Sequence, residues 1–236
     1  MILNRSILRS SLKLMAAVAI LSAVSFAGTT YWNLDQVPSW SNCGTCAGAY
    51  GRGPNTPRSM TENNSSPSID GRSAKFSIYP TTSFSNALWW KGVGANSSNH
   101  FTYDFYVYIT NPAVAQALEF DSNQASNGVR HIFGTECDMK GAHQWRVWGN
   151  NVWNSTGIYC NMPAYRWNHV TWEFTRYNGR TNFVALTVNG AKHYVNRSYS
   201  GYGSGANFLD IAVQLDGIAG THSYSIWTDK MNLTAF

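Results

Sequence analysis

The sequence predicts an all-β protein built as a two-sheet antiparallel β-sandwich, and three observations support this class. Beyond the first 27 residues, no stretch repeats apolar residues with the 3.6-residue spacing of a helix. Short segments rich in Tyr, Phe, Trp, Val and Thr instead alternate between apolar and polar residues, and turn residues separate them. About eleven such segments follow one another, which is typical of a large sandwich or jelly roll.

Two segments show most clearly a strand with one side in the core and one side in water. In residues 101–110 the odd positions are aromatic or aliphatic, and the even positions carry hydroxyl or carboxyl groups. The segment Leu209–Asp216 has the same split, with Asp210, Gln214 and Asp216 on its polar side. Further strands are expected at residues 74–79, 86–91, 114–124, 129–136, 144–148, 169–176, 182–188, 192–196 and 223–234.

Two Asn-Gly pairs predict tight hairpins, because both central residues of such a turn need positive φ. They are Asn127-Gly128 and Asn189-Gly190. If the first is a two-residue turn, paired residues have numbers that sum to 255, so Glu119 lies opposite Glu136. Directly opposed Cβ atoms are about 4.5 to 5.5 Å apart, so this register predicts two facing carboxyl groups.

Residues 1–27 have the layout of a secretory signal peptide. Arg5, Arg9 and Lys13 precede an apolar run that ends in Ser25-Phe26-Ala27. A membrane anchor is the alternative, but this uncharged run is shorter than the roughly 20 residues that span a bilayer. We therefore expect a secreted protein, extracellular or periplasmic, with no membrane span once the signal is removed.

After cleavage, residues 28–236 are expected to form one domain. Residues 28–70 are rich in loop signals and are predicted to wrap the sandwich, and residues 71–236 are predicted to form it. Cleavage removes 3 of the 17 basic residues and none of the 12 acidic ones, so the formal charge falls from +5 to 14 − 12 = +2. The remaining Lys and Arg residues are scattered, so we do not expect a nucleic-acid partner.

The four cysteines are predicted to form two disulfides. An even count in an exported chain favours disulfides over free thiols. We expect Cys43 to pair with Cys46 and Cys137 with Cys160. A redox Cys-x-x-Cys motif and a zinc site are the alternatives. Against the redox motif, no helical pattern follows Cys43 and Cys46. Against zinc, Cys137 and Cys160 are not a second closely spaced pair.

Three segments of the last 70 residues or so resemble the signature of the laminin-G-like and concanavalin A-like lectin/glucanase superfamily. They are Trp167–Phe174, Leu186–Gly190 and Ile226–Leu233. The chain also resembles uncharacterised secreted bacterial members. The resemblance implies two curved sheets with a concave face, which in relatives holds a glycan, a catalytic carboxylate set or nothing.

One strand gathers polar residues that are suited to such a face. Glu119, Asp121 and Asn123 alternate with apolar residues and so share one side. Retaining glycosidases hold two carboxyl groups about 5 to 5.5 Å apart, so Glu119 could act as nucleophile and Glu136 as acid/base. In the glucanases that this segment resembles, however, the second glutamate stands where this chain has Asn123. The other interpretations are pairing with Arg130 or Arg146, binding of a neutral sugar, and a calcium site.

Aromatic residues are the second indication of a binding face. The chain has 10 Trp, 13 Tyr and 11 Phe, which is more than one core needs. In residues 144–148, Trp145 and Trp148 lie on opposite sides, so Trp148 is expected to be the exposed platform if Trp145 is in the core. Adjacent Trp89 and Trp90 must likewise point in opposite directions. Exposed indole rings favour sugar binding, because they stack on sugar rings.

The function expected from the sequence is that of a secreted, lectin-like protein that binds a polysaccharide or other glycan on its concave face. The expected contacts are Glu119, Asp121, Asn123, Trp148, Gln214 and Asp216. The alternatives are a glycoside hydrolase or polysaccharide lyase that uses Glu119 and Glu136, and a structural surface or matrix domain. No cofactor or metal site is expected, although a structural calcium stays open because oxygen ligands are present without an Asp-x-Asp-x-Asp loop.

Overall fold

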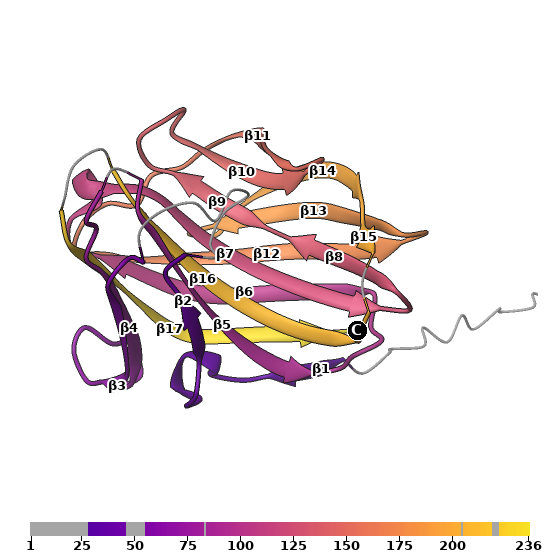
Figure 1. Cartoon of the computed structure of the whole chain (residues 1–236), viewed down its shortest axis with the longest axis horizontal. Helices are drawn as coiled ribbons and strands as arrows, with labels where there is room; N and C mark the ends of the chain where they lie inside the picture. The colour runs from indigo at the N-terminus through magenta and orange to yellow at the C-terminus, as the bar shows by residue number, and fades with distance from the viewer. Residues whose placement is uncertain (1–27, 46–54, 83, 204, 219–221) are drawn as a thin grey trace, which may run out of the picture.

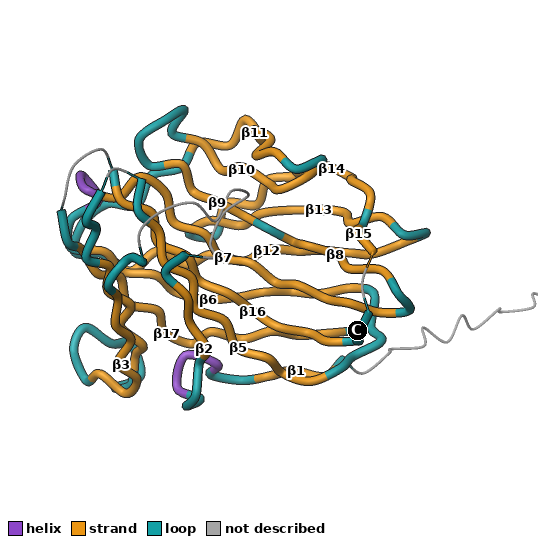
Figure 2. The backbone as a smooth tube through the Cα atoms, in the orientation of Figure 1, coloured by secondary structure: helices purple, strands orange, loops and turns teal. Residues whose placement is uncertain are grey.

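The protein is a sandwich of two antiparallel sheets (Figures 1 and 2). The computed structural model describes residues 28–45, 55–82, 84–203, 205–218 and 222–236. Over these residues the only helical elements are two short 3₁₀ turns, η1 (Leu34–Gln36) and η2 (Pro112–Val114). The all-β, two-sheet fold class predicted from the alternation is therefore confirmed.

The first sheet has eight strands, and its order differs from the chain order because the chain crosses repeatedly between the two sheets. Its main path runs β14 (Ala191–Ser200), β13 (Arg180–Val188), β12 (Trp167–Tyr177), β6 (His100–Ile109), β17 (Tyr224–Ala235), β4 (Ser73–Ile78), β3 (Arg58–Asn64). The short strand β1 (Thr29–Tyr31) pairs with the end of β17.

The second sheet has nine strands and carries the candidate site. Its main path runs β11 (Val152–Tyr159), β10 (Gln144–Gly149), β9 (Thr135–Asp138), β7 (Ala115–Ser126), β16 (Phe208–Gly217), β5 (Asn86–Gly94), β2 (Ser41–Cys43). Beside β9, β7 also pairs with β8 (Val129–Phe133), which in turn pairs with β15 (Tyr202–Gly203). Residues 28–70 thus supply strands β1, β2 and β3 at the sheet edges.

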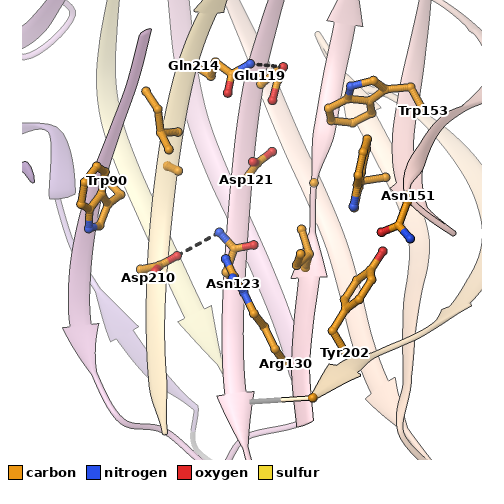
Figure 3. Close-up of a pocket in the computed structure, with 16 residues that line it drawn as sticks. Trp90, Glu119, Asp121, Asn123, Arg130, Asn151, Trp153, Tyr202, Asp210 and Gln214 are labelled. Atoms are coloured by element: carbon orange, nitrogen blue, oxygen red, sulfur yellow. Dashed lines mark hydrogen bonds between the residues drawn. The ribbon is translucent and has the colours of Figure 1, made fainter. Parts of the chain in front are cut away.

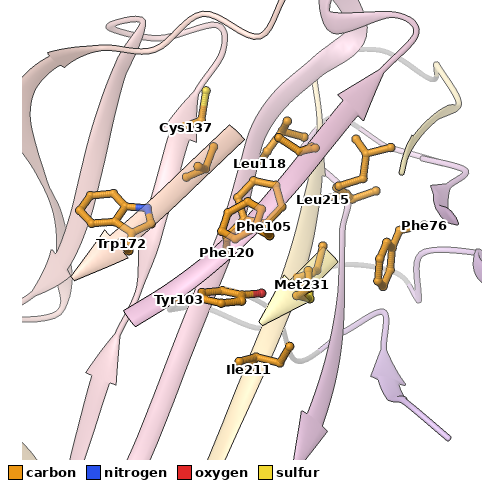
Figure 4. Close-up of a cluster of buried hydrophobic side chains, with 14 of the residues drawn as sticks. Phe76, Tyr103, Phe105, Leu118, Phe120, Cys137, Trp172, Ile211, Leu215 and Met231 are labelled. Carbon is orange, nitrogen blue, oxygen red and sulfur yellow. The ribbon is translucent and has the colours of Figure 1, made fainter. Parts of the chain in front are cut away.

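The core lies between the two sheets and is rich in aromatic rings (Figure 4). Phe105 of β6 and Phe120 of β7 pack with their ring centroids 4.5 Å apart, and Trp145 meets Trp172 edge-on at 5.8 Å. Every odd position of β6 is buried, as the alternation predicts. Burying one such side chain contributes about 1.5 to 3 kcal/mol, so these rings hold the two sheets together.

Both Asn-Gly turns are confirmed. Asn127 and Gly128 have φ of 53° and 77°, and Asn189 and Gly190 have φ of 49° and 85°. From Ser126 opposite Val129, the register continues without a shift to Glu119 opposite Glu136. The single strand expected over residues 129–136 is divided at Gly134, whose carbonyl accepts a hydrogen bond from Trp148 of β10. The turn therefore brings the two glutamates to adjacent positions.

Among the described residues, the predicted disulfide between Cys137 and Cys160 is present. The other predicted pair includes Cys46, which lies outside the described residues, as does the predicted signal segment 1–27. Strand β11 was not predicted, because its polar run Asn154-Ser155-Thr156 lacks apolar alternation. No helix in the described part of the chain is long and apolar enough to cross a membrane.

Candidate functional site

A cleft of about 560 Å³ opens on the outer face of the nine-stranded sheet (Figure 3). Strands β5, β7, β8, β10, β15 and β16 contribute to it, together with β11 and the turn before it. The lining residues are Leu88, Trp90, Glu119, Asp121, Asn123, Arg130, Ile132, Gly134, Trp148, Asn151, Trp153, Tyr202, Gly203, Asp210, Ala212 and Gln214. The cleft therefore joins polar side chains on its floor to aromatic side chains at its sides.

The floor is made by two neighbouring strands, β7 and β16. Glu119 of β7 lies opposite Gln214 of β16, and Asn123 lies opposite Asp210. Between these pairs, Asp121 lies opposite the small side chain of Ala212. Because alternate residues of a strand point the same way, these residues face the cleft, while Phe120 of β7 and Val213 of β16 point into the core.

Hydrogen bonds order the floor. Gln214 donates from Nε2 to Glu119 at 2.5 Å and to Asp216 at 3.0 Å. Asn123 donates from Nδ2 to Asp210 Oδ1 at 3.0 Å (Figure 3). The two amide groups therefore hold three carboxyl groups in fixed positions, of which Glu119 and Asp210 line the cleft.

Asp121, at the centre of the floor, has a different partner. Its Oδ1 accepts a hydrogen bond from the backbone N–H of Thr135 at 2.9 Å. Thr135 begins β9, directly after the break at Gly134. The break thus turns a backbone donor towards the cleft floor instead of into the sheet ladder. This fixes the position of Asp121 and leaves its second oxygen without a donor among the described residues.

The facing glutamates lie close together but in different surroundings. One carboxylate oxygen from each of Glu119, Glu136 and Asp216 lies within 4.8 Å of the other two. Glu136 is 2 % exposed, does not line the cleft and forms an ion pair with Arg146. Arg146 Nη1 also lies 3.6 Å from Asp138 Oδ2. Glu119 therefore faces the cleft, whereas Glu136 lies in an ion-paired layer beside it.

These three oxygens are the group in the described chain that could ligate a cation. Calcium needs six to eight oxygen ligands. Here Glu119 already accepts a hydrogen bond from Gln214, and Glu136 already forms an ion pair with Arg146. A cation would have to displace both partners, so the trio fits a calcium ion poorly.

Burial raises the pKa of every carboxyl group on the floor. The pKa of Glu119 lies well above its ordinary value, because Glu119 is desolvated and faces Asp216, Asp121 and Glu136. The pKa of Asp121 rises to about 7, and that of Glu136 to about 8 although Arg146 lowers it. The same desolvation raises the pKa of Asp210 and Asp216 to about 6. The cluster thus retains protons near neutral pH.

Half of the acidic residues of the chain lie on three strands of the nine-stranded sheet. Two acidic residues come from each of β7, β9 and β16, which makes six of the 12 in the whole chain. The nearby cations are Arg146, which is paired with Glu136, and Arg130, which is exposed at the rim of the cleft. The six acids of these strands therefore outnumber their two guanidinium partners, and burial raises the pKa of five of them.

Aromatic side chains flank the floor on both sides. Trp90 of β5 lies on one side of the row that contains Asp121, and Trp153 and Tyr202 lie on the other (Figure 3). Trp148 packs edge-on against Trp153 with ring centroids 5.2 Å apart. All four are half-buried, so part of each ring faces the cleft.

The absence of a side chain at Gly134 leaves room for one of these rings. A Cβ atom at this position would lie 2.8 Å from Cβ of Trp148, closer than real Cβ contacts. Gly134 lines the cleft beside Trp148 and belongs to neither β8 nor β9. A larger residue at position 134 would therefore displace the indole from the side of the cleft.

The structure brings most of the expected contacts together. Glu119, Asp121, Asn123, Trp148 and Gln214 line the cleft. Of the other expected residues, Asp216 does not line it but shares the Gln214 amide with Glu119. As expected, one indole of each predicted pair is in the core, namely Trp89 and Trp145.

Four lining residues were not among the expected contacts: Trp90, Trp153, Tyr202 and Asp210. The alternation of β16 already placed Asp210 on its polar side, and the Trp89-Trp90 pair placed one indole outside the core. No sequence signal indicated Trp153 or Tyr202, because β11 and β15 were not predicted and their neighbours are set by the tertiary fold.

Comparison with known proteins identifies the fold. Neither a protein family nor a curated protein matches this chain. The endo-β-1,4-glucuronan lyase from the fungus Trichoderma reesei is similar with a TM-score of 0.55 and 11 % identity, over 87 % of this chain and 95 % of that one. The alginate lyase vAL-1 from Chlorella virus has a TM-score of 0.51 and 11 % identity, over 77 % and 90 %. The fold is the concanavalin A-like jelly roll that the resemblance implied.

Proposed function

We propose that this protein binds carbohydrate in the cleft of its nine-stranded sheet and does not chemically change it. The observation that carries the proposal is the lining itself, in which half-buried aromatic rings stand on both sides of a row of carboxyl and amide groups. A sugar ring has apolar C–H faces and a rim of hydroxyl groups. Aromatic rings can stack on the apolar faces of the sugar, and carboxyl and amide oxygens can accept hydrogen bonds from its hydroxyl groups.

The polar groups of the floor are free to accept sugar hydroxyls. Asp121 accepts one backbone hydrogen bond and Asp210 one amide hydrogen bond, each through Oδ1. In both carboxyl groups, Oδ2 accepts no hydrogen bond from the described residues. Because Gln214 and Asn123 hold their neighbours in place, the floor is organised before a ligand arrives, which lowers the entropic cost of binding.

The neighbours of known structure support a glycan as occupant, but not the chemistry of a uronate lyase. Both are named for polysaccharide substrates, glucuronan and alginate, which are polymers of uronic acids. At and above about pH 7, where Asp121 and Asp210 ionise, this floor would repel a chain with a carboxylate on every sugar. We therefore propose that the ligand of this cleft is not a polyuronate.

We also propose that the protein acts outside the cytoplasm. The disulfide between Cys137 and Cys160 supports this, because disulfides persist in oxidising compartments.

A retaining glycosidase is the second candidate. The observation that favours it is the close approach of the Glu119 and Glu136 carboxyl oxygens, within 4.8 Å of each other. The raised pKa of Glu136, about 8, also suits a general acid. Against it, Glu136 does not line the cleft and its carboxylate is held by Arg146, so it cannot reach a glycosidic oxygen without breaking that ion pair.

One experiment separates these functions. The purified exported protein is mixed with a set of plant and microbial polysaccharides, and both retention in affinity electrophoresis and new reducing or unsaturated ends are measured. We expect retention without new ends, and a loss of about tenfold or more in affinity for Trp148→Ala. Tyr177→Ala is the matched control, because Tyr177 is 71 % exposed on the other sheet.

Other outcomes would replace the proposal. New reducing ends that disappear in Glu119→Gln would establish the glycosidase. No retention and no new ends across the set would leave a structural surface or matrix domain as the function. Equal retention of the Trp148→Ala and Tyr177→Ala variants would place glycan binding outside the cleft.

A further inference from the structure

The cleft has an unusual charge balance for a site that would bind neutral sugars. Three carboxyl groups line it, from Glu119, Asp121 and Asp210, against the single guanidinium of Arg130 among the described residues. Arg130 is exposed, and its guanidinium lies 5.7 Å from the ring centroid of Phe208, at the rim. Neutral hydroxyl groups could be bound by amides alone, so this excess of acid needs a separate reason.

The arrangement of the acids points to an extended ligand and not to a single ion. Asp121 and Asp210 lie on neighbouring strands, and Glu119 lies two residues from Asp121 along β7. Alternate residues of a strand are about 7 Å apart, so a point charge at one end cannot contact all three. Asp121 and Asp210 are also outside the group of oxygens that converge on one point. A chain that repeats a positive charge fits such a row.

Two further observations indicate a ligand that donates hydrogen bonds and carries charge. Asn123 Oδ1 is buried, in a residue that is 7 % exposed, and no described residue donates to it. Asn123 lines the cleft two residues along β7 from Asp121 and directly opposite Asp210 (Figure 3). The flanking rings of Trp90, Trp148 and Trp153 attract cations through their π faces as well as stacking on sugars. An ammonium group satisfies both, since it has three N–H donors and a positive charge.

We infer that the cleft selects amino sugars, and that its ligand is a polysaccharide of the glucosamine or galactosamine type with free, protonated amines. This inference rests on the proposed function and names the class of glycan. The indoles stack on the sugar rings, while Asp121 and Asp210 accept from the ammonium groups of successive or neighbouring sugars. Acetylation of the amine removes the charge and two of its three donors, so the acetylated polymer loses these contacts.

The protonation of the floor supports the inference. Burial raises the pKa of Asp121 to about 7 and that of Asp210 to about 6. The charged groups around Asp121 are Glu119 on its own strand, Asp210 and Asp216 on β16, Arg130 on β8, and the paired Glu136 and Arg146 on β9 and β10. A bound ammonium adds an opposite charge and favours the ionised acids. Binding at pH 6 therefore releases protons.

The test compares a glucosamine oligomer with its fully N-acetylated counterpart by titration calorimetry at pH 6, where the amine of glucosamine is protonated. We expect the free amine form to bind at least about tenfold more tightly, since charge-assisted hydrogen bonds are the stronger ones. Repeating the titration in buffers of different ionisation enthalpy should reveal proton release with the amine form alone.

Two conservative variants and a matched control locate the effect. Asp121→Asn and Asp210→Asn keep the Oδ1 acceptor that binds the backbone of Thr135 or the amide of Asn123, so the floor should stay folded. Each should weaken the amine form about tenfold or more and weaken the acetylated form, which lacks the charge, by much less. Glu173→Gln removes the same charge from the other sheet, where Glu173 pairs with Lys192, and should change neither.

The outcomes distinguish the two proposals. If the acetylated oligomer binds as tightly as the amine form, the inference is overturned while carbohydrate binding stands. If no saccharide binds, both fail. If polylysine of similar length competes fully with the glucosamine oligomer and Trp148→Ala does not weaken binding, the attraction is that of a polycation for an acidic surface, and the inference is again overturned.

Discussion

The two outer faces of the sandwich differ in how their acidic groups are neutralised. On the eight-stranded sheet, Asp104 accepts from His169 Nε2 at 2.8 Å and also from the hydroxyl of Thr171, and Glu173 accepts from Lys192 at 2.6 Å. On the nine-stranded sheet, six carboxyl groups share two guanidinium groups. Asp104 and Glu173 therefore each meet a basic side chain of their own, whereas the acids of the nine-stranded sheet outnumber their basic partners.

The aromatic residues of the two faces differ in the same way. On the eight-stranded sheet, Tyr108 is surrounded by the rings of Tyr165, Trp167 and Trp227 at 5.4 to 6.5 Å, so these rings pack on each other. On the nine-stranded sheet, Trp90 and Trp153 stand apart on opposite sides of the cleft (Figure 3). A face that only stabilises the fold fills its own gaps, whereas the cleft face keeps a space open between its rings.

The largest expected effect is on stability, and it tests whether the buried acids of the nine-stranded sheet depend on the guanidinium of Arg146. Arg146→Met leaves the buried Glu136 and Asp138 without their guanidinium, and we expect a loss of about 3 kcal/mol or more in the free energy of unfolding at pH 7. Lys192→Met removes the exposed ion pair on the other face and should cost far less. Both are measured by urea denaturation, and equal losses would contradict the comparison.

The pH dependence of stability is the next effect. The pKa of Asp121 is about 7 in the folded protein against 3.8 ordinarily, and that of Glu136 about 8 against 4.5. Between these values the folded state binds more protons than the unfolded state, so stability falls as pH rises. We expect the free energy of unfolding to drop by at least about 2 kcal/mol from pH 5 to pH 8.

A substitution in the cleft tests whether the floor acids cause this pH dependence of the free energy of unfolding. Asp121→Asn should flatten the profile between pH 5 and pH 8, whereas Glu173→Gln should leave it as in the unaltered protein. A profile that rises with pH over this range would show that the floor acids are ionised and paired in the folded state.

The smallest expected effect concerns Glu119. This side chain is 5 % exposed, and burial together with the neighbouring acids raises its pKa well above the ordinary value, so a neutral amide of the same shape should replace it well. We expect Glu119→Gln to change the free energy of unfolding at pH 7 by less than about 1 kcal/mol. Glu136→Gln should cost more, because it breaks the ion pair with Arg146. A larger loss for Glu119→Gln would mean that this group is ionised in the fold.

Local patterns in the sequence determined the orientation of most site residues. Alternation along residues 115–126 placed Glu119, Asp121 and Asn123 on one side, because neighbouring side chains of a strand point in opposite directions. The Asn127-Gly128 turn determined that Glu119 lies opposite Glu136, because a two-residue turn sets the register of the hairpin. These predictions hold because they depend on residues close together in the chain.

Only the tertiary structure decided which faces come together and what each carboxyl group meets. β16 lies beside β7 although about 80 residues separate them, and this pairing gives Glu119 its partner Gln214 and Asn123 its partner Asp210. The same strand order brings Trp153 and Tyr202 to the cleft and places Glu136 beside Arg146, with which it forms an ion pair. Alternation assigns a side chain to a face but carries no information on the neighbouring strand, because sheet order follows from packing the whole core.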